Sequence, residues 1–261
     1  MNLGNYSGVW CIYPPRFNDS LTLLKTLDVR SLAGRRPVVS KAYSTVNSVA
    51  VIEVYGTLTK AGSCLGGGST VEVRRSVRQA ESDHRVKSIL LVFDSPGGTV
   101  AGIGDLANEI RSTTKPTVGF VEDLCCSAAY WAASQCDKVY ANNAIAMVGS
   151  IGTFMAVYDV SKALENEGVK TVVVKAGEFK GGGFPGMKVT DSQVKEWQKI
   201  VDATQDEFNA ALRSGRKLSL IATRRVNTGL AYTAKEAMDF NLIDGIKSFD
   251  EVLASLQKLK N

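Results

Sequence analysis

Histidine is nearly absent from this sequence: His84 is the only one among 261 residues. A single imidazole excludes every mechanism that needs two, including the helical H-E-x-x-H zinc sites. Cysteine is also sparse and irregularly spaced, with no C-x-x-C pair, which argues against a zinc knuckle, a redox motif or a disulfide scaffold. We therefore expect free thiols in a reducing compartment. The cysteines are Cys11, Cys64, Cys125, Cys126 and Cys136.

Long apolar runs are missing as well. No stretch approaches the ~20 consecutive apolar residues of a membrane span, so no transmembrane segment is expected. The first ten residues contain no basic residue ahead of an apolar core, which argues against a secretory signal. The net charge of +5 is spread along the chain, whereas a nucleic-acid binder would concentrate it in a patch. With 44% apolar and 22% charged residues, the composition is that of a globular protein.

The chain divides into two parts by its pattern. Residues 1–47 contain three of the six prolines and show no clean periodicity. We expect them to form an N-terminal extension, either a segment that wraps a neighbouring subunit or a poorly ordered terminus. Residues 48–261 alternate between strand and helix patterns and are expected to form one domain.

Strand and helix signals alternate regularly after residue 48. An apolar β-branched run covers 49–55, and Ser69 with Glu72 forms a capping signal for the helix that follows. The nearly all-apolar run 88–93 is typical of a strand buried on both faces of a parallel sheet. This alternation predicts an α/β fold whose site lies at the carboxyl ends of the strands. Further strands are expected over 117–121, 138–141 and 171–175, and further helices over 103–110, 127–135, 163–167 and from 191.

Three loops that follow predicted strands carry candidate chemistry. Residues 94–99 contain Gly97-Gly98, whose backbone N–H groups could bind a developing oxyanion, although an ordinary turn has the same pattern. Residues 125–130 contain Ser127, which fits a nucleophile or a helix N-cap. Residues 175–183 contain Lys180 among glycines, which fits a base or a solvated loop lysine.

A serine nucleophile needs a base, and His84 is poorly placed to serve. His84 precedes the strand 88–93, so it belongs roughly 20 Å from the glycine loop at the other end, at ~3.3 Å per residue. A neutral lysine is the remaining strong base. Burial would have to lower its pKa from about 10.4 to about 7–8.

Six segments in order resemble the signal peptide peptidase A (SppA) family of Ser-Lys proteases, which includes phage capsid-assembly proteases. The resemblance runs from Val49 to Ile246, about three quarters of the chain. The segments are Val51–Leu58, Asp94–Gly98, Cys126–Tyr130, Val148–Gly152, Gly177–Lys180, and Tyr232–Ala237 followed by Leu242–Asp244.

The resemblance implies a role for each of five residues. Ser127 would be the nucleophile, Lys180 the general base, and Ser150 the group that orients the lysine. The N–H groups of Gly98 and Ala128 would form the oxyanion hole. These roles describe a serine endopeptidase that works through an acyl-enzyme intermediate.

The resemblance also implies a setting. The fold would be crotonase-like, as in Clp proteases, with a parallel sheet and repeated βαβ units. The protein would be a homo-oligomer whose subunits share active sites, acting on peptides or unfolded proteins without a metal or organic cofactor. Its location would be the cytoplasm of a bacterial or phage-infected cell, in protein degradation or capsid maturation.

Two departures and two alternatives accompany this interpretation. Ala129 stands where the family usually has glycine, and Glu178 where many members have lysine. A crotonase-type acyl-CoA enzyme would instead use a carboxylate near the site, for which Asp123 is the nearest candidate. A catalytically inactive, shell-forming subunit would leave Ser127 and Lys180 unexplained.

Overall fold

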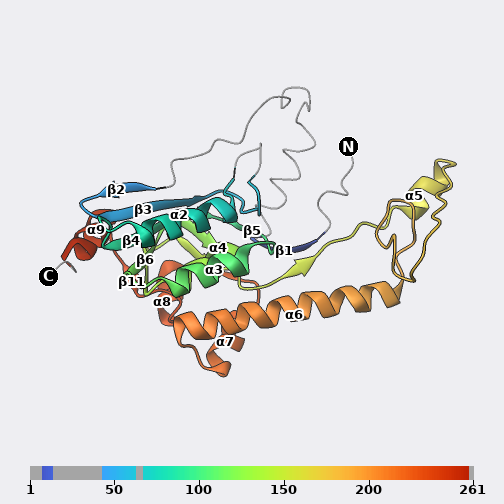
Figure 1. Cartoon of the computed structure of the whole chain (residues 1–261). Coiled ribbons are helices and arrows are strands. Elements are labelled where there is room, and N and C mark those ends of the chain that lie inside the picture. The colour runs from blue at the N-terminus through green and yellow to red at the C-terminus, as the bar shows by residue number, and fades with distance from the viewer. Residues whose placement is uncertain (1–7, 14–42, 63–66, 259–261) are drawn as a thin grey trace.

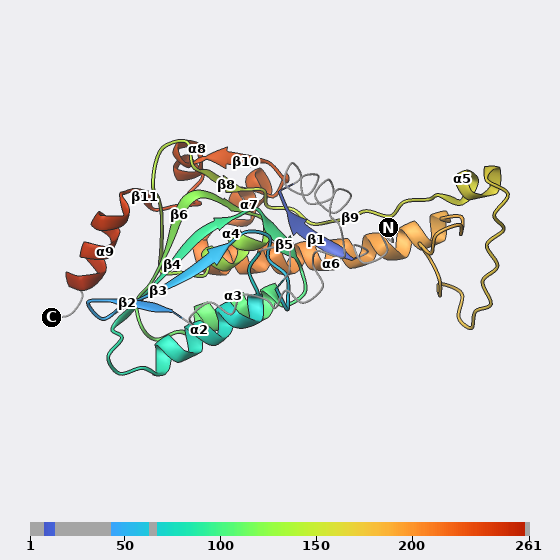
Figure 2. The same cartoon turned by 90° about the horizontal axis from the view of Figure 1, so that it is seen from above.

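A mixed β-sheet forms the centre of the computed structural model, which describes residues 8–13, 43–62 and 67–258 (Figure 1). Within these residues the sheet has eight strands. They are β2 (Ser44–Val46), β3 (Val49–Tyr55), β4 (Ser88–Ser95), β6 (Thr117–Cys126), β7 (Lys138–Ala141), β8 (Met147–Gly149), β10 (Ala231–Thr233) and β11 (Gly245–Ile246). The spatial order is β10-β8-β6-β4-β3-β2, with β7 beside β6 and β11 beside β7 (Figure 2).

The middle of the sheet is parallel. β3 pairs with β4, and β4 with β6, in parallel register, while the edge strands β2 and β10 pair antiparallel. All six residues of 88–93 are buried, as expected of a strand covered on both faces. The predicted α/β fold class, with parallel βαβ units, is confirmed.

Helices cover both faces of the sheet. On one face, α2 (Thr70–Ser82), α3 (Ile103–Ser112) and α4 (Ala128–Ala133) pack against alternate residues of β4, including Ile89, Leu91 and Phe93. On the other face, α9 (Phe249–Lys258) packs against Leu90 and Val92 (Figures 1 and 2). The predicted capping by Ser69 is confirmed, because its hydroxyl accepts the N–H of Glu72 at 3.2 Å. The remaining helices are α5 (Ser161–Asn166), α6 (Asp191–Arg216), α7 (Leu220–Val226) and α8 (Ala234–Asp239).

A separate three-stranded sheet holds the start of the described chain. It consists of β1 (Val9–Ile12) between β5 (Gly97–Thr99) and β9 (Phe154–Met155), paired antiparallel on both sides. Residues 8–13 and 43–47 are therefore paired with the rest of the subunit, whereas 14–42 lie outside the described residues. The division of the chain at residue 47 stays a prediction.

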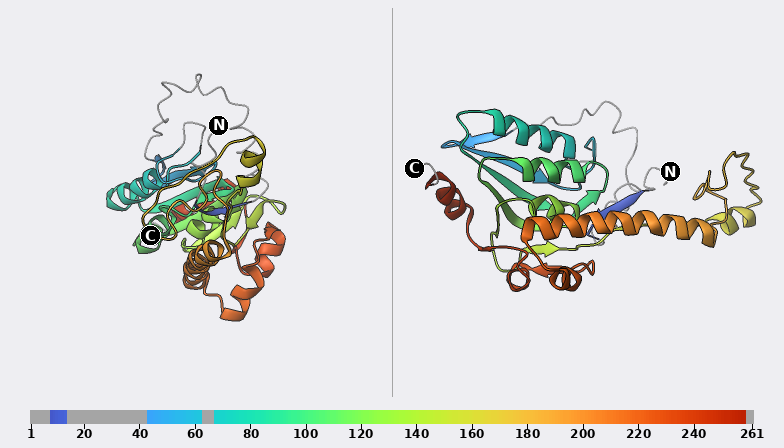
Figure 3. Two further views of the ribbon diagram at one scale, coloured as in Figure 1. Left: turned by 90° about the vertical axis from the view of Figure 1, so that its right-hand side faces the viewer. Right: turned by 60° about the horizontal axis from the view of Figure 1, so that its bottom comes forward.

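Residues 156–200, which we call the arm, project from the remainder of the subunit, which we call the body (Figures 1 and 3). The arm includes α5 and the outer part of α6, whose inner part is anchored by the buried side chains of Phe208 and Leu212. The predicted strand 171–175 is wrong: the structure assigns no strand there, and Val172 and Val174 are 73% and 96% exposed. Their β-branched pattern finds no described neighbouring strand within the same chain. No described helix is both long and apolar enough to cross a membrane.

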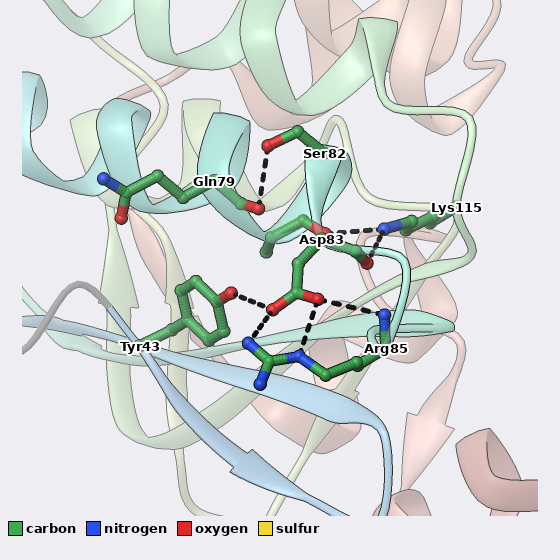
Figure 4. Close-up of polar contacts among 7 residues, drawn as sticks. Tyr43, Gln79, Ser82, Asp83, Arg85 and Lys115 are labelled. Atoms are coloured by element: carbon green, nitrogen blue, oxygen red, sulfur yellow. Dashed lines mark hydrogen bonds and ion pairs between the residues drawn. The ribbon is translucent and has the colours of Figure 1, made fainter.

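Polar contacts link the segments that precede β2, β4 and β6 (Figure 4). The Tyr43 hydroxyl donates to Asp83 at 2.9 Å, and the Arg85 guanidinium donates to both oxygens of the same carboxylate at 3.0 and 2.8 Å. These bonds, from Arg85 first and then Tyr43, hold the pKa of Asp83 well below its usual range. The Lys115 ammonium adds a bond to the Asp83 carbonyl at 2.8 Å.

Candidate active site

A break in register at the end of β6 creates the site. Phe93 pairs with Val121, but Ser95 pairs with Cys125, so three residues of β6 stand opposite one residue of β4. Beyond this bulge, β6 pairs with β8 as far as Cys126 and leads directly into α4. The strand therefore runs five residues past its predicted end, and its terminus carries Ser127 to the beginning of a helix.

Ser127 has a strained backbone. Its φ of 56° and ψ of −118° lie outside the regions that side-chain-bearing residues favour, at a cost of about 1–3 kcal/mol. The surroundings hold it there: its N–H donates to Gly149 at 2.6 Å, and its carbonyl accepts the N–H of Trp131 at 2.8 Å. Ser127 stands at the N-cap position of α4, but its side chain makes no capping bond to the helix. Strain of this kind is often found at functional positions.

The Ser127 hydroxyl is fully buried and faces two acceptors. It lies 2.8 Å from Cys11 Sγ and 3.4 Å from the Gly152 carbonyl oxygen. Burial raises the pKa of the Cys11 thiol to about 12, against a smaller lowering by the Ser127 hydrogen bond. Cys11 is therefore a neutral thiol and cannot act as a base at neutral pH. Among the described residues, no lysine, histidine or carboxylate is hydrogen-bonded to the Ser127 hydroxyl.

The glycines of β5 lie against the start of α4. A Cβ on Gly97 would stand 2.8 Å from the Ala128 nitrogen, and a Cβ on Gly98 would stand 1.8 Å from the Leu58 carbonyl oxygen. Only glycine allows the backbone of β5 to approach this closely. The structure thus brings Gly98, Ser127 and Ala128, which are far apart in the sequence, to one place.

Ser150 lies beside the same junction. Its N–H donates to Leu230 at 2.7 Å, and the preceding residue, Gly149, is bonded to Ser127. The Ser150 side chain is buried and makes no hydrogen bond to the other described residues, and the residue borders a cavity of about 450 Å³. The cavity is lined by Ile12, Ser150, Gly152, Thr153, Phe154, Gln198, Val201, Asp202, Gln205, Asn227, Thr228 and Gly229.

Lys180 is not brought to this cluster within one chain. It lies in the segment 167–190, which is beyond the outer end of α6, while α4 lies in the body (Figures 1 and 3). The Lys180 side chain is exposed, and the nearby Lys175 donates a hydrogen bond from its ammonium to the carbonyl of Glu178. The nucleophile candidate and the base candidate therefore occupy different regions of the subunit.

Other candidates lie away from the cluster. His84 is exposed at the amino end of β4, as predicted, and Ser127 follows the carboxyl end of the neighbouring β6. The Asp123 side chain is exposed and accepts a long bond of 3.5 Å from Asn143. The described residues contain no group of three or more metal-ligating side chains.

Two contributors to the site were missed by sequence reasoning. Cys11 sits in the N-terminal stretch, which has no periodicity, so nothing in the sequence pointed to a contact with Ser127 across 116 positions. Gly152 was noted only as part of a motif, yet its carbonyl faces the Ser127 hydroxyl. The four described cysteines are free and buried, in agreement with the expectation of free thiols, and Cys64 lies outside the described residues.

Comparison with known proteins gives a consistent family assignment. A family-wide sequence profile of peptidase family S49 matches residues 109–261. The capsid assembly protease C of Escherichia phage lambda is 30% identical over 92% of this chain and 56% of its own length. Protease 4 of Haemophilus influenzae is 25% identical over 84% of this chain and 36% of its own length. The chain spans about half the length of the first curated relatives it matches.

Solved structures provide more distant similarities. One is an enoyl-CoA hydratase/isomerase family member, with 16% identity, a TM-score of 0.49, and coverage of 83% of this chain and 74% of that chain. Another is a membrane-bound stomatin-specific protease in complex with a substrate peptide, with 16% identity, a TM-score of 0.48, and coverage of 80% and 79%.

Proposed function

Because the chain belongs to peptidase family S49, we propose that it is a serine endopeptidase that forms an acyl-enzyme on Ser127. The observation that carries the proposal is the strained, buried Ser127 at the junction of β6 and α4, directly beside the glycine backbone of β5. A serine held in this way presents its oxygen where a peptide carbonyl could meet backbone N–H donors.

The base is Lys180 of a neighbouring subunit. Within its own subunit the lysine is exposed on the arm, and Ser127 has no basic partner among the described residues. The cavity beside Ser127 is bordered by Ser150, whose hydroxyl can hydrogen-bond an incoming lysine amine. Burial of that amine against the neighbouring body would disfavour its charged form and supply the neutral amine that a base requires.

The arm exposes an apolar surface of the kind that mediates contacts between subunits, which supports a homo-oligomer. Soluble monomers rarely leave many large apolar side chains of one region uncovered. The exposed apolar residues of the arm are Tyr158, Val169, Val172, Val174, Phe179, Phe184, Val194 and Ile200. Packing of these side chains on a neighbour would bring the arm, and Lys180 with it, to the neighbour's body.

The reaction then follows from the roles of these groups. The Lys180 amine takes the Ser127 proton as the serine oxygen bonds to the peptide carbonyl carbon, and the oxyanion accepts hydrogen bonds from the Gly98 and Ala128 N–H groups. The C–N bond breaks as the lysine returns the proton to the leaving amine. Water, activated by the same lysine, which Ser150 helps to orient, hydrolyses the ester.

The test is hydrolysis of a fluorescently labelled, denatured protein by the full chain. Ser127→Ala and Lys180→Ala are each expected to lower kcat by at least about 10³-fold, as removal of a nucleophile or its base does in other serine hydrolases. Lys175→Ala, in the same segment, is the matched control and is expected to retain activity. Full activity in either of the first two variants would overturn the assignment. We propose two candidate substrates, unfolded protein in the cytoplasm and a phage capsid component, and the same hydrolysis assay can compare them.

A further inference from the structure

The strand β1 fills a groove beside Ser127. It lies between β5 and β9, pairing antiparallel with both: Cys11 is opposite Gly98, and Trp10 is opposite Phe154. β1 is not part of the eight-stranded sheet; among the described residues it is the strand that occupies the space between the edges of β5 and β9, which we call the groove.

Backbone hydrogen bonds hold β1 beyond its paired residues. The Tyr13 N–H donates to the Pro96 carbonyl at 2.7 Å, and the Val100 N–H donates to the Val9 carbonyl at 3.2 Å. An extended segment bound by its main chain to the exposed edges of strands is how many proteins bind peptides of varied sequence. The groove therefore resembles a peptide-binding site in which a segment of the same chain is bound.

Cys11 occupies the position nearest the proposed reacting groups. Its Sγ lies 2.8 Å from the Ser127 oxygen. Its carbonyl oxygen lies 2.4 Å from the point that a Cβ on Gly97 would occupy, and the Ala128 nitrogen lies 2.8 Å from the same point. Cys11 therefore places its side chain against the proposed nucleophile, and its carbonyl and the Ala128 nitrogen both lie beside Gly97.

We propose that β1 is an internal pseudosubstrate, which occupies the peptide groove and has to leave before an external peptide can bind. The proposal rests on the proposed function for the identity of the groove, but its occupancy can be tested without hydrolysis. It also defines a substrate class. Cys11 is fully buried, and Trp10 and Ile12 are nearly so, so the groove takes an extended apolar segment with a small residue facing Ser127.

Peptide binding provides the first test. All measurements use the full chain with Ser127→Ala, so that no peptide is consumed, and a fluorescein-labelled peptide Gly-Val-Trp-Ala-Ile-Tyr, which copies residues 8–13 with alanine for cysteine. Cys11→Asp places a carboxylate in a dry site and is expected to expel β1, so that the peptide binds at least ~10-fold more tightly. Cys11→Ser is close to the native residue in size and is expected to bind the peptide as weakly as the chain with Cys11 intact. Equal affinity in all three proteins would overturn the proposal.

Thiol labelling provides a second test that needs no substitution in β1. Alkylation of Cys11 is followed by mass spectrometry of the tryptic segment 1–16 in the Ser127→Ala chain. The buried, neutral thiol is expected to react slowly, and saturation with the same peptide is expected to speed its labelling at least ~10-fold as β1 is displaced. A rate that saturating peptide leaves unchanged would contradict the proposal.

The two proposals can fail separately. If Ser127→Ala and Lys180→Ala keep full hydrolytic activity while the peptide displaces β1, the groove is real and the catalytic assignment is wrong. If both variants are inactive while the peptide neither binds better to Cys11→Asp nor exposes Cys11, the peptidase assignment stands and β1 is a structural strand.

Discussion

The body and the arm of this subunit differ in what they contain, with the proposed nucleophile in the body and the proposed base in the arm. In the body, Ser127 is buried, strained and surrounded by backbone groups, but it has no basic partner among the described residues. In the arm, Lys180 is exposed, and so are several large apolar side chains such as Val174. In the proposed mechanism each region supplies the group that the other lacks, so a site would be complete only where two subunits meet.

The first prediction separates a shared site from a site within one subunit. Ser127→Ala and Lys180→Ala, each inactive alone, are expected to regain activity when the two chains are co-expressed. Random assortment gives each site an even chance of an intact serine and an even chance of an intact lysine, so about a quarter of the native activity should return. Hydrolysis of the labelled denatured protein measures the recovery.

The double variant, with both substitutions in one chain, is the control for this experiment. Mixed oligomers of the double variant and the native chain should retain some active sites, whereas the double variant alone should have none. If Ser127→Ala and Lys180→Ala together stay as inactive as each alone, although their masses show mixed oligomers, the serine and the lysine act within one subunit.

The second prediction concerns the apolar surface of the arm. Val174 is 96% exposed, and replacing it with glutamate would put a charge into any surface that covers it. Val174→Glu is expected to weaken assembly by at least ~10-fold, with activity falling at concentrations where the subunits separate. Analytical ultracentrifugation over a dilution series measures the shift.

A matched substitution in the body sharpens this result. Ile145 is 78% exposed but lies in the body, so Ile145→Glu introduces the same charge at an exposed apolar position outside the arm. It is expected to leave the oligomeric state unchanged. Equal effects of the two glutamates would show that the arm has no special part in assembly.

Much of the body could be predicted from the sequence because its signals are local. The apolar run of β4 and the cap formed by Ser69 each act within a few residues, and both appear in the structure. The exposed position of His84 followed from chain direction alone. The arm misled the same reasoning, because the β-branched residues of 171–175 have the pattern of a strand but no described strand beside them.

The contacts that the sequence did not reveal are long-range. The bulge that extends β6 depends on its pairing with β8, and the contact between Cys11 and Ser127 depends on where β1 settles. Neither feature is marked in the sequence by a periodic pattern or a capping signal. The glycines of β5 were recognised as unusual, but their purpose becomes clear only when Leu58 and Ala128 are seen within contact of them.

The third prediction tests the root of α6, where the arm's helix joins the body. The Arg216 guanidinium, only 7% exposed, lies 2.8 Å from one oxygen of Asp244, which also accepts the Val139 N–H at 2.8 Å. Burial alone would raise the pKa of Asp244, but the bonds from Arg216 and Val139 outweigh it and hold this pKa below its usual value. Asp244→Asn is expected to lower the free energy of unfolding by about 1–3 kcal/mol at pH 7, the range for hydrogen bonds to charged groups.

The pH dependence of this loss follows from the sign of the shift. A carboxyl whose pKa is lower in the folded chain than its unfolded value of about 3.9 stabilises the fold above that pH. The contribution is lost as the pH falls through the lower, folded pKa. Urea unfolding should therefore show a smaller difference between the native chain and Asp244→Asn at pH 3 than at pH 7. Asp239 is an exposed carboxylate with no ion pair among the described residues, so Asp239→Asn is expected to leave the free energy of unfolding unchanged at both pH values. A difference as large at pH 3 as at pH 7 would mean that Asp244 stabilises the root of α6 through contacts that do not depend on its charge.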